Sequence, residues 1–457
     1  MADLAFYFDV VCPYAYIASS RVEVLCLRCG ATLEWKPCLL GGLYHATKAP
    51  QGKAGSATAA MSAQRVAIAT QDLRREVRRA GLPPLNPPAS HPVRTLQAQR
   101  WLCATEPPSA RVALAKALYA AYWVDALDLA NLDNDGVTER VLRKLAPEAV
   151  ASARDGLARM LQAPSAALSG TAALEAADAL RANTAAAVEA GAFGVPAFVV
   201  RRSGRLFWGQ DRMLFVEAAL RKIVSSAVPR PVPRVAARSA SLQLRFFFDF
   251  GSPWAFLGST QAQRVAAEHG AELVYVPILL GAVFKAIGTA NLPMLEMSSV
   301  KRAYGSLDVQ DWQKHWRLGT TMGFPSSLPA EFPVRTVLPL RAAIASECNR
   351  AVVDALFRAV WVDDMPIGTA AATEAVLAPV VGEREAARLV ALAAQPAAKG
   401  ELKANTARAL ESGVCGVPSF QISVRGRLYG EVFFGQDRLE GAVSDALQAA
   451  GQDGARL

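Results

Sequence analysis

The stretch "FYFDVVCPYAY", residues 6–16, returns almost unchanged at residues 246–256 as "FFFDFGSPWAF". Both contain an aromatic run, an Asp, two further residues and then X-Pro-aromatic-Ala-aromatic, where X is Cys12 or Ser252. Aromatic runs favour strands, and Pro suits the first turn of a helix because its missing N–H would have no partner there. Each stretch therefore predicts a strand followed directly by a helix, with X at the helix N-terminus.

Four further pairs of segments repeat in the same order along the chain. A repeat of this length indicates a duplicated domain and excludes a solenoid of short units. The pairs are "HPVRT" (91–95) with "FPVRT" (332–336), "YWVDAL" (122–127) with "VWVDDM" (360–365), "RANTAAAVEAGAFGVPAFVV" (181–200) with "KANTARALESGVCGVPSFQI" (403–422), and "FWGQDRM" (207–213) with "FFGQDRL" (433–439).

A Pro-rich segment, "SSAVPRPVPRVAARSAS" at 225–241, separates the two copies. Its prolines cannot continue a helix, so it is expected to be extended. The sequence therefore predicts a first domain over 1–225, a linker over 226–240 and a second domain over 241–457.

Each copy begins with a strand, a helix and a second strand, and it ends with two strands and a helix. Between these parts lie Ala- and Leu-rich stretches with helical periodicity, at residues 60–190 and 297–412. The pattern predicts an α/β fold in which a helical insertion separates a β-α-β half from a β-β-α half.

Composition narrows the range of functions. The 457 residues are 52% hydrophobic and 19% charged, with a net charge of +9, which admits acidic small molecules as partners. The basic residues are scattered, so nucleic acid is not expected to bind, and no apolar run is long enough to predict a membrane span. The N-terminus does not resemble a signal peptide, which favours a cytoplasmic protein. The seven cysteines argue against a disulfide framework, and no motif has metal-ligand spacing or the pattern of a phosphate loop.

The position of X suits the stabilisation of an anion, because a helix N-terminus offers free N–H groups and the positive end of the helix dipole. A Cys there is expected to have a lowered pKa and to be a better nucleophile. A Ser hydroxyl is better used to donate a hydrogen bond to a neighbouring anion, such as a bound thiolate.

Each "GVP" motif, at 194–196 and 416–418, fits a turn with a cis X-Pro bond. The backbone of its Val could then pair with a peptide-like ligand.

Taken together, these motifs resemble the thioredoxin-like superfamily. Within it they are similar to the 2-hydroxychromene-2-carboxylate isomerases and the kappa-class glutathione transferases, and the helical insertion is shared with DsbA-type oxidoreductases. The resemblance covers nearly all of both copies and implies two tandem thioredoxin-like domains, each with a DsbA-like helical insertion. It also implies a glutathione-dependent isomerase or transferase that acts on an aromatic, conjugated carboxylate, with isomerisation by reversible addition of the thiolate.

The resemblance assigns roles to residues of the second copy. Ser252 would hydrogen-bond the glutathione thiolate, and the other residues would form the surrounding site. Val417 and Pro418 would pair with the cysteinyl unit, Asp437 and Arg438 would hold the γ-glutamyl end, Lys285 and Asn291 would lie in a loop that closes over the substrate carboxylate, and Trp254 and Phe256 would wall an aromatic pocket.

The first copy departs from this pattern at its reactive position. Cys12 replaces the Ser, and His45 stands in the loop where the second copy has Lys285. Ala15 occupies the position where a dithiol oxidoreductase has its second Cys, so dithiol cycling is not expected. The glutathione-binding pairs Val195 with Pro196 and Asp211 with Arg212 are kept.

Other interpretations remain open on the sequence alone. Cys12 could act as a monothiol through a glutathione mixed disulfide, or the first copy could be a non-catalytic partner. Ser252 could be only a helix N-cap, and Asp437 with Arg438 only a surface ion pair. "CLRC" (26–29) and Cys415 are expected to be packing residues. Since these families tend to form homodimers, the tandem chain is expected to build a pseudo-dimer within itself, as a monomer or a homodimer in solution.

Overall fold

The computed structural model describes residues 2–49, 58–132, 136–161, 172–222, 242–316, 318 and 328–454. The proposed linker at 226–240 lies outside these ranges. The chain divides into two compact units. Unit 1 comprises Met1–Ala60, Thr70–Ser225 and Met294–Gly305, and unit 2 comprises Met61–Ala69, Ser226–Pro293 and Ser306–Leu457.

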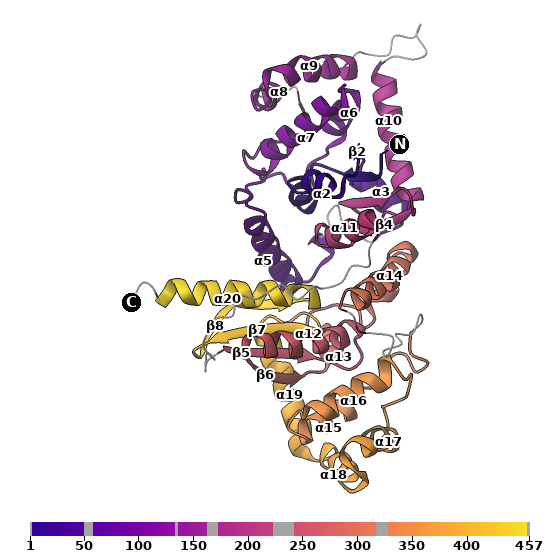
Figure 1. The fold of residues 1–457 in the computed structure, drawn as a ribbon, viewed down its shortest axis with the longest axis vertical. Helices are drawn as coiled ribbons and strands as arrows, with labels where there is room; N and C mark the ends of the chain where they lie inside the picture. Colours follow the sequence, from indigo (N-terminus) through magenta and orange to yellow (C-terminus); the bar gives the residue numbers. More distant parts are fainter. Residues whose placement is uncertain are drawn as a thin grey trace. The chain divides into compact units, whose positions relative to one another are not determined.

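Unit 1 contains a four-stranded sheet in the order β2-β1-β3-β4. Its strands β2 and β4 are labelled in Figure 1. The first pair, β1 (Leu4–Phe8) and β2 (Leu33–Pro37), is parallel, whereas β3 (Ala197–Val200) and β4 (Arg205–Trp208) are antiparallel to their neighbours. The helices that accompany the strands are α1 (Pro13–Ser19), α2 (Val22–Cys29), α3 (Leu40–Ala46), η2 (Gln210–Arg212) and α11 (Met213–Arg221).

Unit 2 repeats this arrangement with longer strands, in the order β6-β5-β7-β8. The strand β5 (Leu242–Phe248) pairs in parallel with β6 (Glu272–Pro277) and antiparallel with β7 (Ser419–Val424), which in turn pairs with β8 (Arg427–Phe434). The accompanying helices are α12 (Pro253–His269), α13 (Leu280–Ala286), η4 (Gln436–Arg438) and α20 (Leu439–Gly454). The helix that follows the first strand is therefore continuous in unit 2 but divided into α1 and α2 in unit 1.

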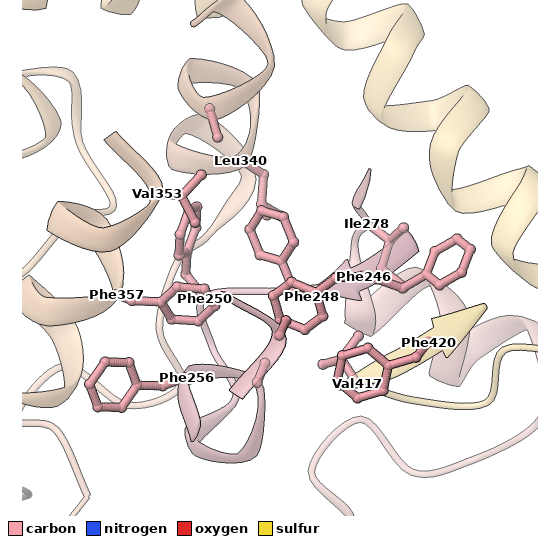
Figure 2. Packing of buried hydrophobic residues seen from close by; sticks show 14 of the residues in the cluster. Phe246, Phe248, Phe250, Phe256, Ile278, Leu340, Val353, Phe357, Val417 and Phe420 are labelled. Carbon is pink, nitrogen blue, oxygen red and sulfur yellow. The ribbon is translucent and has the colours of Figure 1, made fainter. Parts of the chain in front are cut away.

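The predicted aromatic strand forms the centre of the unit 2 core (Figure 2). Phe246 stacks on Phe248 and on Phe420 of β7, with ring centroids 5.3 Å apart in both pairs. Phe250 packs edge-on against Phe248, and Phe357 of the helical insertion lies 4.8 Å from Phe250. These rings join the sheet to the insertion, and their burial fixes the strand end from which the reactive turn starts.

A helical insertion separates the second and third strands of each copy, as predicted. None of the described helices is long and apolar enough to cross a membrane. The first insertion contains η1 (Thr58–Ala60), α5 (Ala63–Arg79), α6 (Leu96–Ala104), α7 (Pro108–Trp123), α8 (Val137–Leu142), α9 (Pro147–Leu161) and α10 (Ala172–Glu189). The second contains η3 (Pro293–Glu296), α14 (Ser299–His315), α15 (Val337–Ala345), α16 (Arg350–Trp361), α17 (Ala370–Val381), α18 (Glu383–Ala393) and α19 (Pro396–Glu411).

Each unit also includes a short segment from the other sequence copy. In unit 1, the Tyr304 hydroxyl accepts a hydrogen bond from the Trp208 backbone N–H at 2.9 Å, and the Tyr304 ring lies edge-on to Phe193. In unit 2, Ile68 joins the hydrophobic core. The units are therefore not simply the two halves of the sequence.

Candidate functional site

The reactive turn of unit 2 joins β5 to α12 and places Ser252 at the helix N-cap. The Ser252 hydroxyl accepts a hydrogen bond from the Ala255 N–H at 3.2 Å, and Pro253 opens the first turn. Ser is favoured at this position because its side chain satisfies an N–H group that has no partner within the helix. The N-cap expected from sequence is therefore present, and Ser252 is only 6% exposed.

The second part of the site is the turn before β7, where the Val417–Pro418 bond is cis, as predicted. The Ser252 hydroxyl lies 3.4 Å from the Val417 carbonyl oxygen and can donate to it. The Val417 N–H makes no hydrogen bond to any residue in the described part of the chain. This turn therefore has a backbone donor, the Val417 N–H, that no described residue satisfies.

A glycine allows α12 to lie directly on the cis-proline. A Cβ atom at Gly258 would stand 2.8 Å from the Pro418 Cβ, a distance that real Cβ atoms essentially never show. Any side chain here would push the helix away from the turn. Gly258 therefore helps to bring Ser252 and Val417 together.

The "GQDR" motif is attached to the same turn. The Gly435 N–H donates to the Pro418 carbonyl at 3.0 Å, and Gly435 adopts a φ of 109°. A Cβ at Gly435 would lie 2.7 Å from an Asp437 carboxylate oxygen, so only glycine permits this approach. Asp437 and Arg438 form an ion pair of 3.1 Å, with side chains 13% and 15% exposed. The pair follows Gly435 directly in the chain and is mostly buried, so it is not a loose surface pair.

The residues predicted to bind the substrate lie mostly at the surface. Lys285 and His45 stand in the last turns of α13 and α3, so the prediction that both belong to loops was wrong. Both side chains are exposed, as is Asn291, whereas Trp254 in the first turn of α12 is half-buried. Within the described residues, no hydrogen bond or ion pair joins Lys285 or Asn291 to Ser252.

Phe256 does not line an open pocket. It is 3% exposed and belongs to the hydrophobic core, where its ring lies 5.9 Å from that of Phe357. The prediction of a pocket wall at this position was therefore wrong. An aromatic residue one helical turn after the N-cap points toward the sheet, because that face of α12 is the buried one.

Unit 1 has the same frame around a thiol. The Cys12 thiol donates to the Val195 carbonyl at 3.1 Å, next to the cis bond between Val195 and Pro196. Burial raises the pKa of Cys12 to about 12, although the N–H groups of Ala15 and Tyr14 act in the opposite direction. The expectation of a lowered pKa was wrong, because the loss of hydration outweighs the helix N-terminus.

The remaining elements of the unit 1 site match those of unit 2. The Gly209 N–H donates to the Pro196 carbonyl at 3.0 Å, and Asp211 pairs with Arg212 at 2.9 Å. All seven cysteines are free, and Cys26 and Cys415 are buried. Cys415 lies in the hydrophobic core, in agreement with the expectation of a packing role.

Two positions that hold the reactive turn were missed in the sequence. The buried Asp249 carboxylate accepts from the Gly251 and Leu280 N–H groups, and the Trp361 indole N–H donates to the Phe250 carbonyl. Both residues recur in the first copy, as Asp9 and Trp123. Their repetition, in "FDV" (8–10) with "FDF" (248–250) and in "WVD" of both copies, was the available signal.

Comparison with known proteins supports the duplicated architecture. The DSBA-like thioredoxin domain model matches residues 3–221 and 243–448. A 2-hydroxychromene-2-carboxylate isomerase of Pseudomonas sp. (strain C18) is 30% identical over 207 residues, 44% of this chain and 90% of that protein. Glutathione S-transferase kappa 2 of Caenorhabditis elegans is 23% identical over 45% of this chain and 91% of that protein. A solved structure of a 2-hydroxychromene-2-carboxylate isomerase covers 47% of this chain and 99% of its own, with 23% identity and a TM-score of 0.38.

The two matched segments cover both sequence copies, and each carries the strand, reactive turn, helical insertion and cis-proline described above. The chain therefore belongs to the DSBA-like thioredoxin domain family, carries the domain twice, and is related to 2-hydroxychromene-2-carboxylate isomerases.

Proposed function

We propose that unit 2 is a glutathione-dependent isomerase or transferase that acts on an aromatic, conjugated carboxylate. The observation that carries the proposal is the position of the Ser252 hydroxyl, at the α12 N-terminus and 3.4 Å from the Val417 carbonyl. The names of the relatives, an isomerase and a glutathione transferase, favour the same chemistry.

The residues of the site fit a tripeptide thiol. The Val417 N–H has no partner among the described residues, so the cis-proline turn has a free donor for a ligand backbone. The Ser252 hydroxyl can rotate from the Val417 carbonyl to a sulfur atom, and the Ala255 N–H holds its oxygen in place. Asp437 would receive the ammonium of a γ-glutamyl group, with Arg438 as its neutralising partner.

Bound glutathione would supply a thiolate nucleophile that is expelled again after the conjugated bond has rotated. The chain would stabilise that thiolate with the Ser252 hydroxyl and the N–H groups of the first turn of α12. The exposed Lys285 ammonium would hold the substrate carboxylate, and Trp254 would contact its ring. A site that stabilises an anion with fixed donors needs little reorganisation during the reaction.

Unit 1 would contribute little to this reaction. Its Cys12 has a pKa of about 12 and remains a protonated thiol at neutral pH, which disfavours the monothiol alternative. Its cis-proline turn and its Asp211–Arg212 pair are intact, so glutathione could still bind there without activation.

The test is a calorimetric titration of the full-length, reduced protein with glutathione, combined with ultraviolet absorbance of the bound thiolate. We expect binding, and a thiolate signal that Ser252→Ala removes and Cys12→Ala leaves unchanged. Absence of binding would overturn the proposal. A thiolate signal that survives Ser252→Ala and disappears in Cys12→Ala would move the activity to unit 1.

A further inference from the structure

Asp249 directly follows β5, at the start of the reactive turn, and it is 3% exposed. One carboxylate oxygen accepts the Gly251 N–H at 2.9 Å, and the other accepts the Leu280 N–H at 2.8 Å. The Thr336 side chain is a third hydrogen-bond partner. A single buried carboxylate therefore connects the reactive turn, the first residue of α13 and the residue before α15.

Two of the three contacts can be made only by an acceptor. These two are with backbone N–H groups from different elements, and each takes its own carboxylate oxygen. An amide has only one acceptor oxygen, and its NH₂ group would face an N–H group. Asparagine therefore cannot replace Asp249 in all of its contacts, although the two side chains have nearly the same shape.

A second side chain holds the next residue of the turn. The indole N–H of Trp361, at the end of α16, donates to the Phe250 carbonyl at 2.8 Å, and Trp361 is 1% exposed. The carbonyl of Phe250 and the N–H of Gly251 belong to the same peptide group. Asp249 binds the N–H of this peptide group and Trp361 binds its carbonyl. The peptide group, which joins Phe250 to Gly251, is thus fixed directly before Ser252.

The same arrangement occurs in unit 1, although its reactive residue differs. Asp9 accepts from the Leu40 N–H at 2.9 Å and from the Thr95 hydroxyl at 2.8 Å. The Trp123 indole N–H donates to the Val10 carbonyl at 2.9 Å. Both units therefore have these contacts, although the residue at the reactive position is a serine in unit 2 and a cysteine in unit 1.

We propose that Asp249 is a positioning residue of the unit 2 site: together with Trp361 it fixes the peptide that presents Ser252, and it sets that turn relative to α13, which carries Lys285. This inference rests on the proposed function, since it assigns Asp249 to the stabilisation of the same bound thiolate. Asp249 acts through the turn and does not touch the ligand.

The experiment compares Asp249→Asn with the matched variant Asp9→Asn, in the full chain. The first readout is the pKa of the bound glutathione thiol, from a pH titration of thiolate absorbance. We expect Asp249→Asn to raise this pKa by about one unit, a roughly tenfold smaller thiolate fraction at a given pH below the pKa, while Asp9→Asn leaves it unchanged. The dissociation constant of glutathione, measured at a pH well below the pKa of the bound thiol in both proteins, should change little, because the cis-proline turn is intact.

The direction in which the thiol pKa shifts distinguishes the loss of positioning from the loss of the negative charge of Asp249. Removing a negative charge near a thiolate lowers the pKa of the thiol. A lowered or unchanged pKa in Asp249→Asn would therefore overturn the proposal. Trp361→Phe, which removes one N–H without changing charge, is the second variant, and it too should raise the pKa.

The second readout does not depend on glutathione. Hydrogen–deuterium exchange by mass spectrometry should show faster exchange in Asp249→Asn at residues 250–256 and 279–286, with the equivalent segments of unit 1 unchanged. If the wild-type protein fails to bind glutathione, the proposed function falls and this exchange pattern alone decides whether Asp249 fixes the turn. Unaltered exchange in both segments would overturn the inference.

Discussion

The reactive turns before α1 and α12 have the same frame but different reactive atoms. Both have a buried Asp, an indole N–H on the turn and a cis-proline opposite, yet Cys12 is a protonated thiol and Ser252 is a hydroxyl held by an N–H group. The comparison shows that the backbone frame and the chemistry of the site are separate features. Cys12 and Ser252 are each only 6% exposed, so the two sites differ in the reactive atom and not in its burial.

The largest expected difference concerns the reactivity of Cys12. A thiol pKa of about 12 in place of 9.0 leaves a thiolate fraction smaller by about 10³ at neutral pH, and the thiolate population grows only as pH rises toward 12. Alkylation of Cys12 in the native protein, followed by mass spectrometry, should be slower than in the unfolded protein by at least that factor. Labelling at equal rates in the two states would contradict the buried thiol.

Exchanging the two reactive residues sharpens the comparison. Ser252→Cys places a thiol in the frame that raises the pKa in unit 1, so turnover of glutathione with an activated aryl halide should fall by about 10². Cys12→Ser, which supplies a hydroxyl to the Val195 carbonyl, should leave that turnover unchanged. Equal losses in both variants would show that the two copies share the activity.

The residue that matches Gly258 in the first copy differs from it by one methyl group. Unit 2 has Gly258 six residues after Ser252, and unit 1 has Ala18 six residues after Cys12. Gly258→Ala should destabilise the protein by about 1–3 kcal/mol, because the new Cβ would stand 2.8 Å from that of Pro418.

Chemical denaturation measures the Gly258→Ala effect, with Ala18→Gly as the control. The control should cost about 1 kcal/mol from helix propensity alone and should leave glutathione affinity at unit 2 unchanged. A stabilised Gly258→Ala variant would show that α12 can move away from the proline without cost.

The smallest effect concerns acid sensitivity. Burial lowers the pKa of His315 from 6.5 to about 4. Between these two pH values the imidazole is neutral in the folded protein but protonated in the unfolded chain. The stability that this shift provides is present above pH 6.5 and is lost as pH falls toward 4. Between pH 7 and pH 4.5 the Tm of His315→Phe should fall by about 2–4 °C less than that of the wild type. An identical pH dependence in the two proteins would contradict the shift.

The frame of the fold could be predicted because its signals are local. The aromatic strands, the X-Pro turns and the "GVP" motifs each depend on a few neighbouring residues, and the structure confirms the strands, the N-cap and both cis bonds. The helices at Lys285 and His45 were missed because Gly281 and Gly41 with Gly42 weaken helix propensity. Their first N–H groups are bound by the distant Asp249 and Asp9, which local sequence does not reveal.

The chemistry of the site was harder to predict than its position. The spacing of Cys12 indicated a helix N-terminus, but the degree of burial depends on residues such as Val195, which are brought close only by the fold. Asp249 and Trp361 were likewise visible as repeated letters, while their partners lie in other elements. Repetition between the copies identified the important positions, and only the structure gave their roles.

The composition of the two units has a practical consequence for dissecting the protein by expression of its halves or by limited proteolysis. Unit 1 includes Met294–Gly305, and unit 2 includes Met61–Ala69 with its core residue Ile68. A cut within the Pro-rich sequence at 225–241 would leave unit 1 without the Tyr304 contact to Trp208, and unit 2 without Ile68. Neither fragment would contain its complete unit, so each copy should be studied by point substitution in the intact chain.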